Sequence, residues 1–225
     1  MDARFELLKA DAVNIPGDVL KKALKAAQCF LPASHDNAPE SLYHVRMRVG
    51  GQYVYFEATD RYVIGSVEVL ARTSIDNYED YYLDPDMVKH LVKNISIKED
   101  YYIVPDTDGW KIFDSVGWEV AVGYHSHQLF PQVGRVLARE SVVFPSEVIE
   151  HSYFVDADLM RKITAASKVL GKQTIMEMES KSPDKVIRFI LWNSTTPALT
   201  VYGGVKHTRL ESSFSLMRHI DNLPK

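Results

Sequence analysis

Two histidines and one cysteine are the side chains of this sequence best suited to metal binding or nucleophilic chemistry. His125 and His127 are two residues apart, a spacing that places both imidazoles on one face of a strand. A metal site needs further ligands, and no Cys, Asp or Glu nearby supplies a third, so surface histidines at a strand end are the favoured interpretation. Cys29 lies among apolar residues without an adjacent base, which indicates a small core side chain rather than a nucleophile.

Two pairs of carboxylates have the chemistry of general acids and bases. Asp106 and Asp108 flank an Asp-Gly turn, whereas Glu177 and Glu179 alternate along a strand pattern. Solvated carboxylates explain both pairs. The sequence also contains no GxxxxGK[ST] phosphate loop, no GxGxxG after a strand and no GxSxG elbow. We therefore predict that the protein is not an enzyme and uses no cofactor or metal.

The composition is typical of a folded protein in a reducing compartment. Of the 225 residues, 46% are hydrophobic and 25% are charged, enough to bury a core in one or two domains. The single cysteine excludes an internal disulfide framework. No leader follows Met1, and no apolar stretch approaches the roughly 20 residues of a membrane span, so a cytoplasmic location is expected. The net charge of −4 does not indicate nucleic-acid binding, although a local basic patch would suffice for it.

The elements that would hold these residues repeat three times along the chain, each time as a polar start, an amphipathic helix and several strands. The helices are predicted within 14–31, 81–94 and 152–172, where apolar residues recur at helical spacing. Asp84 and Asp156 are the predicted N-caps, and Gly171 ends the third helix. Strands are predicted at 42–51, 52–58, 63–71, 100–106, 109–116, 118–125, 174–180, 186–193, 198–204 and 212–220. Three tryptophans in strand patterns are expected to be core or half-buried: Trp110, Trp118 and Trp192.

Each predicted helix carries lysine or arginine on the face opposite its apolar face. If the three helices share one side of the molecule, that side is compatible with DNA phosphates. Solvation of an exposed helix face is the simpler explanation for any one helix. The basic residues on these faces, which are the candidates for phosphate contact, are Lys21, Lys22, Lys25, Lys89, Lys93, Arg161, Lys162, Lys168 and Lys172.

Three stretches of the chain resemble the bacterial DNA sliding clamp, the beta subunit of the replicative polymerase. Residues 28–69 resemble its middle domain, in which a helix leads through a loop to strands that end at an Ala-Thr-Asp turn. Residues 130–137, FPQVGRVL, resemble the segment that closes that domain, and residues 214–220, FSLMRHI, resemble the terminal strand of the last domain. The resemblance covers most of residues 12–140 well and the remainder loosely. It implies an α+β DNA-clamp fold of repeated helix-plus-antiparallel-strand units, with sheets outside and helices on the inner face, where the basic residues named above are predicted to face DNA.

The resemblance also implies a hydrophobic pocket beside the Ala-Thr-Asp turn that receives short peptides of polymerase, clamp loader and repair proteins. A strand interrupted in this way can expose backbone and apolar side chains to a peptide. The positions carried over are Thr59, Asp60, Tyr62, Ile64, Phe130, Pro131, Val136, Leu216, Met217 and Arg218. Arg61, Val63 and Leu216 depart from the frequent Gly, Arg and Pro of the family, which predicts a different peptide or a vestigial pocket. Ordinary turn and strand packing is the alternative.

The repeats suggest two domains of unequal size. Residues 1–140 are predicted to form a complete clamp-like domain with halves 12–80 and 81–140, and residues 141–225 a second, shortened one. A linker is expected at 138–152, and a fourth half could be hidden near it. Three halves per chain would fill a family-sized ring of twelve as a tetramer, whereas the chain length is closer to that of clamps that form trimers.

The function that these expectations favour is that of a DNA polymerase processivity factor, phage-encoded or otherwise divergent. It would encircle duplex DNA without reading sequence, tether the polymerase and respond to a clamp loader. It would lie in the cytoplasm, near the nucleoid or in the host cytoplasm if phage-encoded. The first alternative is a clamp-fold adaptor or decoy that forms no ring. The second is a nuclease or other DNA enzyme that uses His125 and His127.

Overall fold

The computed structural model describes residues 8–9, 12–33, 36–71, 79–124, 130–131, 155–179 and 187–205. Two antiparallel sheets and three helices of eight residues or more make up this part of the chain. The α+β class predicted from the sequence is confirmed. None of the described helices has the length and apolarity needed to span a membrane.

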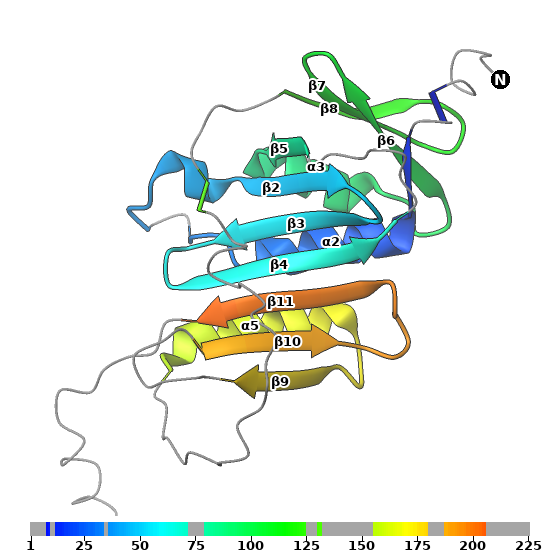
Figure 1. The fold of residues 1–225 in the computed structure, drawn as a ribbon. Helices are drawn as coiled ribbons and strands as arrows, with labels where there is room; N and C mark the ends of the chain where they lie inside the picture. The colour runs from blue at the N-terminus through cyan, green and yellow to red at the C-terminus, as the bar shows by residue number, and fades with distance from the viewer. Residues whose placement is uncertain are drawn as a thin grey trace, which may run out of the picture.

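The larger sheet has seven strands, and every neighbouring pair is antiparallel (Figure 1). In spatial order its strands are β5 (Glu79–Leu83), β2 (Val45–Gly50), β3 (Tyr53–Thr59), β4 (Val63–Leu70), β11 (Leu199–Val205), β10 (Ile187–Trp192) and β9 (Ile175–Glu179). The smaller sheet has four strands in the order β1 (Val13–Pro16), β6 (Asp100–Asp106), β7 (Gly109–Phe113) and β8 (Glu119–Tyr124).

Within the described ranges, three α-helices of eight residues or more pack against these sheets, in addition to the short 3-10 helix η1 (Glu40–Tyr43). They are α2 (Gly17–Gln28), α3 (Pro85–Asn94) and α5 (Ala157–Leu170). Helix α2 contacts both α3 and α5, and Figure 1 shows α2 and α5 behind the same face of the seven-stranded sheet. The predicted caps are confirmed, because Asp84 accepts hydrogen bonds from two first-turn amides of α3 and Asp156 accepts one from the first turn of α5.

The three repeats predicted from the sequence are joined in two different ways. The first strand of each of the first two repeats lies in the sheet of the other, since β1 pairs with β6 and β5 pairs with β2. The first and third repeats are joined edge to edge through the last strand that the structure describes in each, β4 and β11, over seven residue pairs. This junction makes one continuous sheet from segments far apart in the chain.

The core at the β4–β11 junction depends on two glycines that face each other. Gly65 on β4 is directly opposite Gly203 on β11. A Cβ on Gly65 would lie 2.1 Å from the ring of Phe30, and one on Gly203 would lie 1.9 Å from the ring of Phe189. These two rings stack at 5.9 Å between centroids and fill the space above the glycines.

The tryptophans differ from one another in burial. Trp110 is buried and Trp192 is half-buried, as predicted, but Trp118 is 72% exposed, so its predicted burial is wrong. The Asp114 carboxylate accepts hydrogen bonds from the amides of Val116 and Trp118. These bonds form a turn that holds Trp118 outside the strand pattern to which the sequence assigned it.

Candidate functional site

The Ala-Thr-Asp stretch is a tight turn that connects β3 to β4. Oδ1 of Asp60 accepts from the amides of Tyr62 and Val63 at 2.9 and 2.8 Å, and the Asp60 amide donates to the Val63 carbonyl. The Thr59 hydroxyl donates to the same carbonyl at 2.9 Å. Arg61 takes a left-handed conformation, with φ of 83°, at the tip. The amides of Asp60, Arg61, Tyr62 and Val63 therefore all donate within the turn, and a peptide beside it would find none of these donors free.

Lys162 of helix α5 holds the turn from the third repeat. Its Nζ lies 2.6 Å from Oδ2 of Asp60 and 2.8 Å from the carbonyl oxygen of Leu31. Asp60 is buried and the Lys162 side chain is 23% exposed, so little solvent separates the two charges. Lys162 was predicted to face DNA, and the structure instead commits its ammonium group to an internal contact.

Two predicted pocket residues, Ile64 and Phe130, meet in a small cluster separate from the main core. Both are buried, and the half-buried Tyr82 packs against them, with 6.3 Å between the Tyr82 and Phe130 ring centroids. The guanidinium of Arg46 lies 4.7 Å from the centroid of the Phe130 ring. Ile64, Phe130 and Tyr82 thus form an apolar cluster at the position where the resemblance implies a pocket wall.

The cluster lies beside a buried ion pair that sequence reasoning missed. Arg46 donates through Nε to the Glu57 carboxylate at 2.7 Å, and the Ser66 hydroxyl also donates to it. Burial raises the pKa of Glu57, and the charge of Arg46 opposes this rise. The only sequence signal was the alternation of Arg46 with apolar neighbours on β2, which indicates its face of the sheet but not its partner.

The remaining predicted pocket residues are divided between exposed and undescribed positions. Tyr62 is 50% exposed beside Arg61, with 5.9 Å between the guanidinium and the ring centroid, and Pro131 is exposed. The other positions lie outside the described residues: Val136, Leu216, Met217 and Arg218. The cluster of Ile64, Phe130 and Tyr82 is therefore the described part of the candidate pocket.

The predicted DNA-facing residues also fall into two groups. Six are exposed: Lys25, Lys89, Lys93, Arg161, Lys168 and Lys172. Besides Lys162, two half-buried lysines of α2 have internal partners, since Lys21 donates to the Ile95 carbonyl and Lys22 donates to the Thr196 hydroxyl. Fewer cations than predicted are therefore available for phosphates.

Acidic residues in the first turn of each helix reduce the positive charge of the layer formed by α2, α3 and α5. Lys89 pairs with Asp86 at 3.0 Å, and Arg161 pairs with Asp158. Lys22 lies 3.8 Å from Asp18. Such exposed pairs are weak and screened by salt, so the cations remain able to exchange partners.

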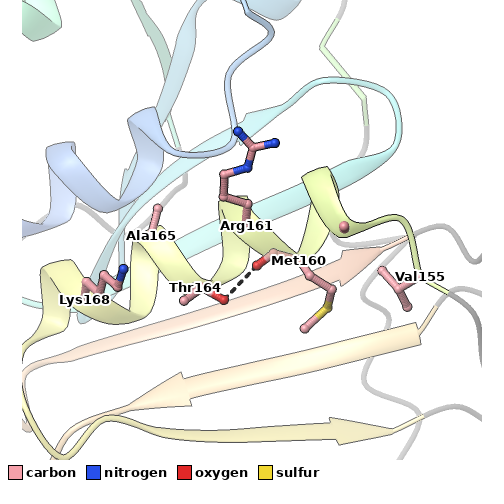
Figure 2. Close-up of a pocket in the computed structure, with 7 residues that line it drawn as sticks. Val155, Met160, Arg161, Thr164, Ala165 and Lys168 are labelled. Atoms are coloured by element: carbon pink, nitrogen blue, oxygen red, sulfur yellow. Dashed lines mark hydrogen bonds between the residues drawn. The ribbon is translucent and has the colours of Figure 1, made fainter.

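A shallow hollow of about 590 Å³ runs along the outward side of α5 (Figure 2). Figure 2 shows Met160, Arg161, Thr164 and Lys168 around it, and the Thr164 hydroxyl donates to the Met160 carbonyl. The hollow is open and lined largely by apolar atoms. It therefore lacks the convergent polar groups of a catalytic pocket.

The residues first considered for catalysis do not assemble into a site within the described ranges. No cluster of three or more His, Cys, Asp or Glu that could hold a metal is present there, and His125 and His127 fall outside those ranges. A hydrogen bond from Lys111 lowers the pKa of Asp106 at the surface, which makes it a poor general acid. Cys29 is half-buried, and burial raises the pKa of its thiol.

The described fold is similar to that of solved sliding clamps. It matches A. fulgidus PCNA, solved with the C-terminal region of FEN-1 bound, with a TM-score of 0.55 and 14% identity over 90% of this chain and 99% of that chain. It matches the DNA polymerase III beta subunit of Pseudomonas aeruginosa with a TM-score of 0.59 and 11% identity, over 94% of this chain and 67% of that one. The corresponding values for the beta subunit of Eubacterium rectale are 0.60, 10%, 94% and 68%.

These similarities confirm the resemblance at the level of the fold. This chain spans about two thirds of the length of those two bacterial subunits and nearly the whole of the archaeal one. No protein-family model matches the sequence, and the search of curated proteins found no match. The chain thus has the sliding-clamp fold, a fold of non-enzymatic proteins, with a sequence far from those of the solved clamps.

Proposed function

We propose that this protein is a DNA polymerase processivity factor, a sliding clamp that encircles duplex DNA and tethers a polymerase through a peptide-binding pocket. The observation that carries the proposal is the edge-to-edge junction of β4 and β11, which continues one sheet across two repeats with α2 and α5 on the same face. The fold similarity to solved clamps supports the same conclusion.

The proposed DNA-facing surface is the layer formed by helices α2, α3 and α5. Only the cations of this layer that make no internal contact with the described residues are proposed to bind phosphates. Lys25, Lys93 and Lys168 are exposed, and they come from three helices. Contacts with phosphates would be weak and independent of sequence, which permits sliding. Lys162 is reassigned from DNA contact to the support of the Asp60 turn.

The peptide surface is proposed at the cluster of Ile64, Phe130 and Tyr82 on the opposite face of the sheet. Polymerase and clamp-loader peptides are its expected occupants, in line with the clamp-bound FEN-1 segment of the archaeal structure. The domain division at about residue 140 stays part of the proposal, and the strand exchange between the first two repeats supports it.

The first test is the molar mass of the purified protein by light scattering over a range of concentrations. A trimer or tetramer is expected, and a monomer at every concentration would rule out a ring made by this chain alone. For DNA, the assembly would be dissociated by dilution and concentrated again with nicked circular plasmid, so that rings can close without a loader. Retention on the circle and loss after linearisation is the expected result, whereas equal retention on both would contradict encirclement.

The second candidate is a clamp-fold adaptor that binds replication proteins without forming a ring. The internal bonds of Lys21, Lys22 and Lys162 favour it, because an adaptor has no need of a basic lining. Neutralising the exposed helix lysines would be harmless to an adaptor and would impair a clamp. A location in the bacterial cytoplasm, or in the host cytoplasm if the protein is phage-encoded, fits both candidates.

A further inference from the structure

Arg61, at the tip of the β3–β4 turn, holds a backbone conformation that its own side chain makes costly. Its φ is 83°, in the left-handed region that glycine enters freely and other residues rarely adopt. The turn does not need an arginine there, because its hydrogen bonds come from the Asp60 carboxylate, the Thr59 hydroxyl and backbone groups. Strained residues are found most often at binding sites, so the reason for an arginine lies in what its side chain does.

The guanidinium of Arg61 is exposed and has no carboxylate partner among the described residues. Its Nη2 donates to the carbonyl oxygen of Asn37 at 3.1 Å, and the group lies 5.9 Å from the centroid of the Tyr62 ring. Both contacts are with neutral groups. They orient the guanidinium beside the ring but leave its charge without an opposite charge and several of its N–H groups without a described acceptor.

Other cations near the cluster of Ile64, Phe130 and Tyr82 already have carboxylate partners. The pairs are Lys162 with Asp60, Arg46 with Glu57 and Arg48 with Asp80. Arg61 differs from these three cations, since no described carboxylate pairs with it. It lies three residues before Ile64, at most about 11 Å along the chain. A peptide that packs on the cluster therefore comes within reach of the long Arg61 side chain.

We propose that Arg61 binds a carboxylate of the partner peptide, next to the apolar residue that packs on the cluster of Ile64, Phe130 and Tyr82. The assignment rests on the peptide surface proposed above and adds the chemistry of its ligand. A guanidinium binds a carboxylate through two parallel hydrogen bonds, which select for geometry as well as for charge. The Tyr62 ring, 50% exposed, supports the guanidinium from one side.

The carboxylate belongs either to an acidic side chain or to the C-terminus of the partner, because both present the same two oxygens. A neutral peptide would lose the contact with Arg61 but keep its apolar contacts. Arg61 therefore contributes selectivity among peptides more than total affinity. Since the guanidinium is exposed, salt should weaken the contact.

The variant Arg61→Gly separates binding from folding. Glycine relieves the left-handed backbone, so the urea midpoint of unfolding should stay equal or rise. A purely structural arginine would instead leave the variant less stable. Loss of selectivity in a protein that is at least as stable as the original is the signature of a binding residue under strain.

The test uses peptides selected from a phage-displayed library of random dodecamers on the purified protein. Clones are kept if Tyr82→Ala, which truncates the cluster, weakens their binding at least 10-fold. Each peptide is synthesised with its acidic side chains intact or replaced by Asn and Gln, and with a free or an amidated C-terminus. Fluorescence anisotropy gives the Kd of each form for the original protein, for Arg61→Gly and for the control Lys98→Gln, an exposed lysine outside the turn.

Peptides that carry the carboxylate should bind Arg61→Gly about 5- to 10-fold more weakly than the original protein, and this ratio should shrink as salt is added. Their neutral forms should bind both proteins equally, and the control should change neither. A loss confined to peptides with acidic side chains would identify a side-chain carboxylate, and one confined to free C-termini would identify a chain end. Circular dichroism verifies that each variant is folded.

Two other outcomes separate this assignment from the proposed function. If Arg61→Gly weakens charged and neutral peptides equally, or weakens none, Arg61 does not select a carboxylate and the peptide surface stays in place. If no selected clone depends on Tyr82, the peptide surface itself is overturned, and the ligand assigned to Arg61 with it.

Discussion

Lys162 on helix α5 and Asp60 in the β3–β4 turn form an ion pair of 2.6 Å between residues that are 102 positions apart in the chain. The pair connects the third repeat to the first, close to the junction of β4 and β11. Since Asp60 is buried, the ammonium of Lys162 compensates a carboxylate that would otherwise be short of partners.

Lys162→Met is expected to lower the free energy of unfolding by about 1–3 kcal/mol, because it leaves the Asp60 charge buried with only its two amide donors. Urea denaturation followed by circular dichroism measures the loss. The matched control is Arg161→Met on the same helix, whose exposed pair with Asp158 contributes at most about 0.5 kcal/mol. Equal losses of stability in the two variants would show that the ion pair with Asp60 contributes no more to stability than an exposed ion pair.

Arg46→Met is expected to destabilise the protein by about 3–5 kcal/mol near neutral pH, because Glu57 would stay buried without its partner. Burial already raises the pKa of Glu57, and loss of Arg46 raises it further. A carboxyl whose folded-state pKa lies above its unfolded value binds more protons when folded, so stability falls as the pH rises through that window.

The deficit of Arg46→Met should therefore be constant at pH values below the folded-state pKa of Glu57 in the unchanged protein, and grow as the pH rises from that pKa to the higher pKa of Glu57 in the variant. Urea titrations at several pH values would measure this slope. The double variant Arg46→Met with Glu57→Gln removes both charges and should recover much of the loss. A deficit independent of pH would mean that packing of Arg46 on Phe130, not charge, dominates.

Replacing Lys25, Lys93 and Lys168 together by glutamine is expected to weaken retention on DNA without changing stability, because all three are exposed. The slope of log affinity against log salt should fall by up to about 0.9 for each phosphate that is no longer neutralised. The control is Lys98→Gln, an exposed lysine outside the three helices. Unchanged DNA retention in the triple variant would favour the adaptor.

Gly203→Ala is expected to lower the free energy of unfolding by about 1–3 kcal/mol, since its Cβ would overlap the Phe189 ring and would lie 2.6 Å from the carbonyl oxygen of Ile64. The variant with Phe189→Leu added should be less destabilised than the sum of the two single changes, because the smaller side chain makes room. Thermal unfolding of the four proteins of this cycle measures the coupling. Strictly additive losses of stability would show that overlap with the Phe189 ring is not what destabilises Gly203→Ala.

The helices and their caps were predictable because their signals are local. Asp84 before Pro85, and Asp156 ahead of an apolar period of helical spacing, determine helix starts whatever the rest of the chain does. The buried faces of the helices were predictable for the same reason, since Leu20, Leu24 and Leu91 recur at the helical period and are buried.

The partners of polar side chains were not predictable, because they depend on which segments meet. Lys162 sits on the polar face of its helix like Arg161, and only the packing of α5 against the β3–β4 turn makes one internal and the other exposed. Arg46 and Glu57 lie opposite each other only once β2 and β3 adopt their register.

The exposure of Trp118 was missed for a different reason. The alternation of residues around it is that of a strand, but the Asp114 carboxylate accepts its amide hydrogen bond and closes a turn at this point. An aspartate before a Gly-containing segment is a turn signal, and it competes here with the strand pattern on either side. The turn prevails because it joins β7 to β8 where the two strands reverse direction.

The exchange of β1 and β5 between the first two repeats affects how the chain can fold as it leaves the ribosome. Strand β1 is synthesised first but has no sheet to join until β6 has emerged, and β4 remains an open edge until β11 follows it by more than a hundred residues. Such long-range pairings fold slowly and expose strand edges meanwhile. Newly made chains should therefore depend on chaperones until Val205 has been translated.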